Sequence, residues 1–205
     1  MESMPTTMER LKQATHPYHA ALEAQVDLPH LAGSLGAYRL VLQRFYGFYL
    51  PVERRLVCLP WALLNFDIRP RLKVARLSAD LLHLGETSAT LARLPTCADL
   101  PALADPAQAC GCLYVLEGAT LGGQIITRRL RRTLDLQPTA GAAFFHSYGD
   151  QVGPMWQAFG AFINHYAATY PGHEEAMVEG ACATFQALRR WLATSGRGSS
   201  IFAGS

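Results

Sequence analysis

The sequence predicts an all-α protein folded as a single domain. Apolar residues recur at steps of three and four through several long segments, which places them on one face of a helix. Prolines, glycines and capping residues mark the ends of these segments, and the chain lacks the alternating apolar pattern of a half-buried strand. With 205 residues and a mass of 22.4 kDa, it can bury one sizeable core but is too short for two ordinary domains.

The first two predicted helices span residues 7–25 and 33–58. Thr6 and Glu9 have the spacing of a capping box, so the first helix begins at about residue 7. One face of the second helix carries Leu35, Tyr38, Leu42, Phe45, Tyr46 and Tyr49. Pro51 predicts a kink or break near the end of that helix.

Two shorter helices are predicted next, over residues 71–84 and 86–93. Prolines cannot continue a helix easily, so they separate these segments from their neighbours. The breaks are expected at Pro60, Pro70, Pro95 and Pro101.

Three long helices complete the domain, over residues 106–132, 154–169 and 173–194. Asp105 is the expected N-cap of the first, with Pro106 at its first helical position, and Gly153 with Pro154 opens the second. The apolar faces of the last two helices carry Met155, Phe159, Phe162, Ile163 and Tyr166, and Met177, Ala181, Phe185, Leu188 and Leu192. Gly196 follows as a stop signal. We therefore expect a domain over residues 7–194 and a flexible tail over residues 195–205.

Composition excludes several classes of protein. Lys and Arg number 18 and Asp and Glu 16, so the formal net charge is +2; half of the residues are apolar and 17% are charged. These values exclude a disordered chain and give no sign of a nucleic-acid binder. No apolar run reaches the roughly 18 residues that a membrane span needs, and the first residues lack the apolar core of a secretion signal. We expect a cytoplasmic protein with neither nucleic acid nor membrane as partner.

The cysteines give no indication of a disulfide framework or a zinc site. There are five, without regular spacing, which is typical of reduced thiols. Cys110 and Cys112 form the only close pair, and they lack the second pair or the histidines that zinc requires.

Other metal and nucleophile motifs are weak or missing. A di-iron bundle needs Glu-x-x-His on each of two helices. The chain offers only Asp27 with His30, a segment that contains Pro29, and Asp80 with His83. It has no G-x-S-x-G, Walker A or H-E-x-x-H motif.

The N-terminal helix carries a first candidate site. Its polar residues are Lys12, His16, His19 and Glu23. His19 and Glu23 are four residues apart and share a face, so the carboxylate can hold one imidazole nitrogen and leave the other for a metal. A solvated surface helix with a polar pair is the alternative interpretation. Pro17 is expected to bend the helix just before His19.

A run of glycines forms the second candidate site. Gly118, Gly122 and Gly123 lie in an otherwise apolar helix, where each costs about 1 kcal/mol relative to alanine. Gly118 and Gly122 are four residues apart, so they bare the backbone on one face. Either a flat ligand or another helix could then approach closely, and both interpretations stand.

An arginine cluster follows the glycines. Arg128, Arg129, Arg131 and Arg132 lie within five residues, and Arg189 and Arg190 lie on the last helix. The first four cannot all point one way, so some are solvated. The cluster could dock an acidic partner or be a simple solvated face.

Together these segments resemble the heme oxygenase family. Residues 11–23 resemble its proximal helix, whose histidine ligates heme iron, and by position in the motif that histidine is His19. Residues 118–124 resemble the glycine-rich distal helix over the other heme face. Residues 148–156 and 185–192 resemble bacterial members, of the type found alongside bacteriophytochromes.

The resemblance implies a heme oxygenase-like fold with heme between the first helix and the glycine-rich helix. His19 would be the axial ligand, with Glu23 holding its other nitrogen. The distal pocket would be lined by Gly118, Gly122 and Gly123. Lys12 and Arg190 match positions that pair with the heme propionates, and Tyr114 lies near the same edge.

The implied activity uses heme as both cofactor and substrate. With dioxygen and external electrons, heme is cleaved to biliverdin, carbon monoxide and ferrous iron. The implied partners are a ferredoxin or flavoprotein reductase as electron donor, and a bacteriophytochrome that receives biliverdin. Two positions depart from the family pattern: Ala119 replaces an aspartate that orders distal water in many members, and Gln186 replaces a basic residue.

Two other hypotheses remain open from the sequence. Ala119 favours a non-catalytic heme-binding or sensing protein, because an altered water network could stall the oxygenated complex. The arginine cluster favours an all-α adaptor that binds proteins and no heme.

Overall fold

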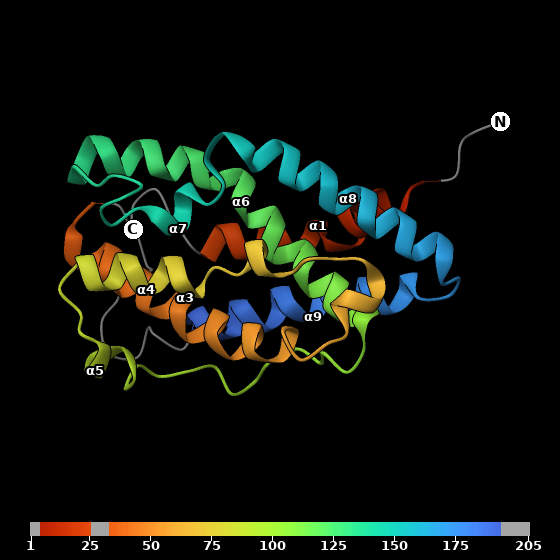
Figure 1. Ribbon diagram of the computed structural model, residues 1–205. Coiled ribbons are helices and arrows are strands. Elements are labelled where there is room, and N and C mark those ends of the chain that lie inside the picture. The colour runs from red at the N-terminus through yellow and green to blue at the C-terminus, as the bar shows by residue number, and fades with distance from the viewer. Residues whose placement is uncertain (1–4, 26–32, 194–205) are drawn as a thin grey trace.

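The computed structural model describes residues 5–25 and 33–193, and it is a bundle of helices joined by loops (Figure 1). About 75% of the described residues are helical, and they contain no strand beyond isolated bridges at Gln137. The predicted all-α class is confirmed. The predicted tail over residues 195–205 lies outside the described residues.

All seven predicted helices are present. The long ones are α1 (Thr7–Gln25), α3 (Leu35–Leu56), α4 (Val74–His83), α6 (Pro106–Leu134), α8 (Val152–Thr169) and α9 (Glu174–Ala193). The short ones are α5 (Ser88–Leu91), α7 (Ala143–His146) and the 3-10 turns η1 (Trp61–Leu64), η2 (Arg69–Arg71) and η3 (Gly149–Gln151). The sequence pattern missed α7 and the 3-10 turns, because each is too short to show a period.

Two prolines lie inside helices, as the predicted spans over residues 7–25 and 33–58 require. Helix α1 runs through Pro17 and helix α3 runs through Pro51. Helix α8 begins at Val152, which places Pro154 inside its first turn, where the missing backbone N–H leaves no bond unmade.

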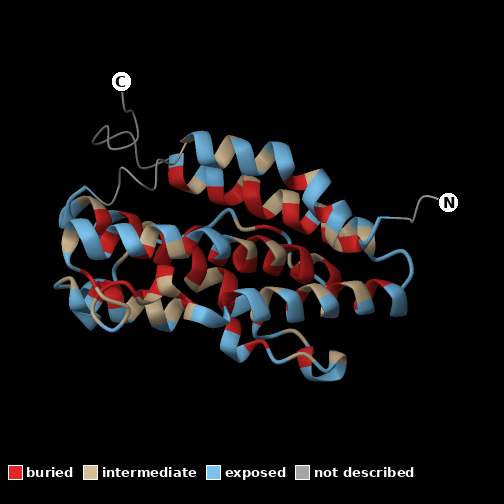
Figure 2. Ribbon diagram, turned by 90° about the horizontal axis from the view of Figure 1, so that it is seen from above, coloured by how far each residue is buried: buried red, intermediate tan, exposed pale blue. Residues whose placement is uncertain are grey.

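Helix α9 is the common neighbour of the helices that matter for function. It packs against both α6 and α1, and it also contacts α3. A Cβ on Gly111 of α6 would overlap the backbone of Met177, and a Cβ on Gly180 of α9 would overlap that of Gln108. These glycines let α6 and α9 approach backbone to backbone. Helix α9 therefore holds α1 and α6 in place, and buried residues line the inner faces of the bundle (Figure 2).

Helix α7 is fixed by a carboxylate. Both oxygens of Asp80 in α4 accept backbone N–H groups, from Ala143 and from Phe144, at 2.8 Å each. Burial raises the pKa of Asp80, and these two hydrogen bonds oppose that rise. Asp80 therefore caps a helix, so the di-iron alternative that used Asp80 with His83 is wrong.

Helix α6 is long and apolar enough to cross a membrane by length and composition, although no uninterrupted apolar run suggested it. In its most apolar window 56% of the residues are buried inside the bundle. This burial is typical of the core helix of a globular fold.

Candidate functional site

His19 lies on α1 with one imidazole nitrogen engaged. Its Nδ1 atom is 3.3 Å from Oε2 of Glu23, one turn further along the helix. The ring of Phe185 in α9 meets the imidazole edge to face, with 5.8 Å between centroids. The His19 side chain is 56% exposed, so Nε2 remains accessible to a ligand from outside. A carboxylate and an aromatic ring thus orient an available metal ligand.

The face of α1 that carries His19 also carries Lys12 and Thr15. Lys12 precedes His19 by two helical turns and is exposed, while Thr15 precedes it by one turn and is buried. His16 is exposed and lies three residues from His19. His19 follows the buried Thr15 by one turn, and its assignment as the iron ligand stays a prediction.

Helix α6 presents an exposed apolar face that begins at Gly118. Leu121 is 46% exposed and Ile125 is 68% exposed, although both are large hydrophobic residues. Among the described residues, nothing lies within 4 Å of the place where a Cβ on Gly122 would stand. A Cβ on Gly118 would lie 3.7 Å from the ring of Trp156 in α8. We call Gly118, Leu121, Gly122 and Ile125 the glycine face.

Gly123 belongs to a different surface from its neighbour. It is buried, and a Cβ there would overlap the carbonyl oxygen of Phe145 in α7. Gly123 therefore has a packing reason to be glycine. The packing interpretation of the glycine run is confirmed at Gly123, while Gly122 keeps an open backbone and its contact with a flat ligand stays a prediction.

A contact between Tyr114 and Thr15 joins α6 to α1. Burial raises the pKa of the Tyr114 phenol, and the neighbouring Thr15 side chain, whose hydroxyl donates to the Leu11 carbonyl at 2.7 Å, opposes that rise. The Tyr114 ring also lies 5.6 Å from the ring of Trp156. Both helices run from the right of the view to the left in Figure 1, so His19 and Gly118 both follow this contact in the same direction. The contact thus marks one end of the site that α1 and α6 would form.

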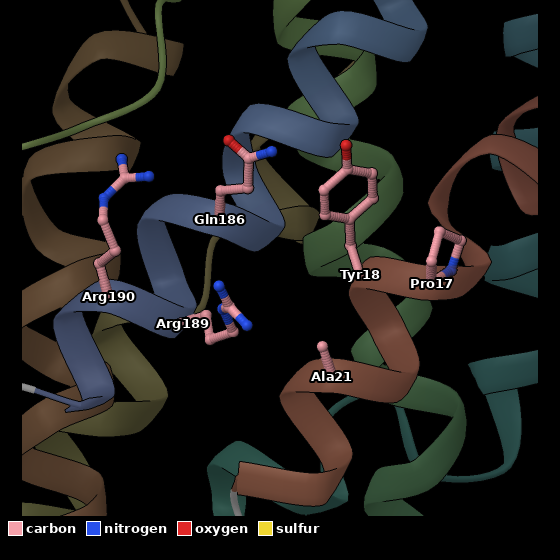
Figure 3. Close-up of a pocket in the computed structure, with 6 residues that line it drawn as sticks. All are labelled: Pro17, Tyr18, Ala21, Gln186, Arg189 and Arg190. Atoms are coloured by element: carbon pink, nitrogen blue, oxygen red, sulfur yellow. The ribbon is translucent and has the colours of Figure 1, made fainter.

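Arg190 is not brought together with Lys12 and His19. Its guanidinium pairs with Asp99, with both Nε and Nη2 2.8 Å from Oδ2, and Figure 3 shows it pointing away from α1. It lines an open groove of about 530 Å³ between α1 and α9, together with Pro17, Tyr18, Ala21, Gln186 and Arg189. The α1 residues of this groove lie on another face of the helix from Lys12, so Arg190 and Lys12 are not side by side here, and the pairing of Arg190 with a heme propionate stays a prediction.

The arginine cluster instead adjoins the glycine face. Ile125 lines a second hollow of about 450 Å³ with Arg128, Arg129, Arg132 and Thr133. The apolar surface of α6 therefore ends in cations, and the exposed Lys12 supplies another cation on α1.

A buried ion cluster lies beside the glycine face and was missed from the sequence. Glu117, directly before Gly118, is 1% exposed and accepts hydrogen bonds from Lys73 Nζ at 3.1 Å and from the Tyr148 hydroxyl at 2.7 Å. Its other oxygen pairs with Arg71. Burial lowers the pKa of Lys73 to about 8, against the opposing charge of Glu117. The sequence does indicate that Glu117 needs buried partners, because it is a lone glutamate in the most apolar stretch of the chain. Only the fold shows which residues those partners are.

The described residues contain no group of three or more His, Cys, Asp or Glu that could hold a metal ion. Cys110 and Cys112 are buried free thiols, and burial raises the pKa of Cys112 to about 12. An iron atom that is itself held in a ring needs only one protein ligand, which His19 can supply. The imidazole, the glycine face and the flanking cations suit a flat apolar macrocycle with carboxylates at its edge.

Comparison with known proteins agrees with these features. Residues 6–194 match the protein family described as Heme oxygenase. The chain is 30% identical over 161 residues to a heme oxygenase of Xanthomonas campestris pv. campestris, an alignment that covers 78% of this chain and 91% of that protein.

Solved structures share the fold. The NO- and CO-bound heme oxygenase of Neisseria meningitidis superimposes with a TM-score of 0.77 at 22% identity, over 93% of this chain and 94% of that one. Heme oxygenase-1 of the cyanobacterium Synechocystis sp. PCC6803, solved in complex with heme, superimposes with a TM-score of 0.67 at 17% identity, over 96% and 95% of the two chains.

Proposed function

The chain belongs to the heme oxygenase family, and on that premise we propose that its α1–α6 surfaces bind heme and degrade it to biliverdin, carbon monoxide and ferrous iron. The single observation that carries this proposal is the pairing of an accessible, carboxylate-oriented imidazole on α1 with an open stretch of backbone at Gly122 on α6. Members of the family use dioxygen and a reductant.

His19 holds the iron in this proposal. When bound, heme supplies both the iron at which dioxygen is activated and the porphyrin that is oxidised. Nε2 of His19 is the ligand atom, because Nδ1 faces Glu23. The carboxylate fixes which nitrogen carries the proton, and the Phe185 ring limits rotation of the imidazole. A neutral imidazole donates less electron density than a thiolate would.

The glycine face forms the opposite wall. Leu121 and Ile125 contact the apolar ring and exclude water, while Gly118 and Gly122 let the backbone approach it. Ala119 is exposed and carries no group that could hold a water molecule or donate a proton. Orientation at this wall therefore comes from shape and from backbone groups.

A cation at the rim would pair with the propionates, and Lys12 is an exposed cation on α1. The arginine cluster follows the glycine face on α6, and it is available to an acidic ferredoxin or flavoprotein reductase. A cytoplasmic location agrees with the five free thiols, and a bacteriophytochrome that receives biliverdin is part of the proposal.

Reconstitution with hemin tests the function. The purified protein is loaded with one equivalent of hemin and reduced in air with a ferredoxin system, and the Soret band and the extracted pigment are followed. We expect the Soret band to disappear and biliverdin to be recovered by chromatography. A stable spectrum without bilin would refute the proposal, and failure to bind stoichiometric hemin would favour the adaptor hypothesis.

Ala119 favours a second candidate function, a non-catalytic heme sensor of the same fold. Its distinguishing result is an oxygenated complex that forms and then returns to ferric heme without loss of porphyrin. Biliverdin formation excludes this candidate.

A further inference from the structure

A buried cluster of charged residues lies directly before the glycine face in α6 and holds its first residue in place. We call Arg71, Lys73, Glu117 and Tyr148 the Glu117 cluster. It joins the end of η2, the residue before α4, the middle of α6 and the residue before η3. Glu117 touches all three of the others, so it is the centre of the cluster.

The charges of this cluster are balanced inside the protein. Lys73 is 2% exposed and Arg71 is also buried, so each needs a local counter-charge. Glu117 pairs with both. A second buried carboxylate, Glu53 of α3, accepts the backbone N–H groups of Lys73 and Val74 and fixes the start of α4. Arg76 lies over the Tyr148 ring, 5.6 Å from its centroid. The cluster is therefore rigidly supported from α3 and α4.

Gly118 and Gly122 bring no side chain that could anchor the start of the glycine face. Glycine gives the chain conformational freedom, and a Cβ on Gly122 would meet no described neighbour within 4 Å. The far end of this stretch is held by Gln124, whose side-chain amide donates to the carbonyls of His146 and Gly149 at 3.2 Å. Glu117 lies one residue before this stretch, and its carbonyl oxygen accepts the Thr120 hydroxyl at 2.7 Å. What holds Glu117 also holds the backbone of Gly118.

The same cluster reaches the aromatic neighbour of Gly118. Nη1 and Nη2 of Arg71 are each 3.4 Å from the carbonyl oxygen of Met155, the residue before Trp156. Arg71 thus contacts both the helix that carries Gly118 and the helix whose ring faces Gly118. Arg71 therefore helps to set the spacing between Gly118 and Trp156, together with the contact of the Tyr114 and Trp156 rings.

We propose that Glu117 and Tyr148 are positioning residues that keep the Gly118–Gly122 backbone at a fixed place facing the bound heme. This inference rests on the proposed function for the identity of the ligand. The restraint itself is a property of the protein alone and can be measured without turnover.

Tyr148→Phe is the test variant, because it removes one hydroxyl from the cluster and keeps the ring. Tyr38→Phe is the matched control, since it deletes a buried hydroxyl whose partner, the Gly141 carbonyl at 2.9 Å, is not part of the Glu117 cluster. Amide hydrogen exchange is measured on both proteins without hemin. We expect exchange at residues 118–123 to rise about tenfold in Tyr148→Phe and to stay at the wild-type rate in Tyr38→Phe.

Glu117→Gln removes the charge at the centre of the cluster and is therefore the more disruptive variant. It is included when its circular dichroism spectrum matches that of the folded wild type. The hemin complexes of all variants are then titrated with azide, a small anion that would bind the iron on the side of the glycine face. We expect altered azide affinity for Tyr148→Phe and Glu117→Gln with an unchanged histidine-ligated spectrum. Unchanged exchange and azide affinity in Tyr148→Phe would overturn the positioning role. Failure of the wild type to bind hemin would instead overturn the proposed function. The hydrogen-exchange result would then still show whether the Glu117 cluster restrains the backbone of residues 118–122.

Discussion

Gly122 and Gly123 are adjacent in α6, yet the side chains they lack would meet opposite surroundings. A Cβ on Gly123 would overlap the carbonyl oxygen of Phe145, whereas a Cβ on Gly122 would have no neighbour within 4 Å among the described residues. One glycine serves the packing of the fold, and the other leaves a surface open.

Alanine at these two positions should have opposite effects on stability. Gly122→Ala should raise the free energy of unfolding by up to about 1 kcal/mol through helix propensity. Gly123→Ala should lower it by about 1–3 kcal/mol, because α7 must shift. Urea unfolding checks both. Gly122→Leu should fold but lose biliverdin formation, since its side chain fills the glycine face; full turnover in that variant would count against the site.

The two histidines of α1 should behave differently. His19→Ala should abolish the histidine-ligated hemin spectrum and turnover, while His16→Ala should keep both near wild type. Absorption spectra of the ferric and ferrous CO complexes distinguish the outcomes. If the two variants exchanged behaviour, the ligand would be His16.

Lys12 and Arg190 should contribute unequally to hemin binding. Lys12→Gln should weaken hemin affinity about threefold to fivefold, as expected for a partly exposed charge pair. Arg190→Gln should change it little, because Arg190 already pairs with Asp99 outside the site. Fluorescence quenching titrations at low salt measure both. Equal losses would return Arg190 to the propionate-binding group.

Stability should fall as pH rises above about 8.5, through the buried thiols. Burial raises the pKa of Cys112 to about 12, above the value near 8.5 in the unfolded chain. A raised folded-state pKa gives a stabilising contribution that is complete below pH 8.5 and is lost as pH rises. Cys112→Ala should therefore show a shallower decline between pH 8 and 10, by about 1–2 kcal/mol in urea unfolding. An identical dependence of the unfolding free energy on pH in the wild type and in Cys112→Ala would contradict this role of the Cys112 thiol.

Arginines at the end of the glycine face should affect electron transfer. Replacing Arg128 and Arg132 with glutamine should slow turnover with an acidic donor protein, and the defect should shrink as salt is raised. Turnover driven by ascorbate provides the control, because it needs no protein docking. A rate unaffected by salt with the protein donor would remove this docking role.

Much of the fold follows from local pattern. The apolar period of α3, α8 and α9 and the N-cap at Asp105 are properties of short segments, so they can be read without the fold. Helix α7 could not be predicted, because its four residues depend on Asp80, which is far away in the chain. The pairing of Arg190 with Asp99 could not be predicted, because spacing along α9 does not tell which neighbour an exposed side chain meets.

By itself the sequence determined the helices, the family, and the two segments that carry His19 and the glycines, since each is a local arrangement of residue types. Tertiary structure alone decided which glycine is open and which is packed, where Arg190 points, and that Glu117 is joined to Arg71, Lys73 and Tyr148. The physical reason is that burial and charge pairing depend on what other segments bring near, and these partners lie between 31 and 46 residues away from Glu117 in the chain.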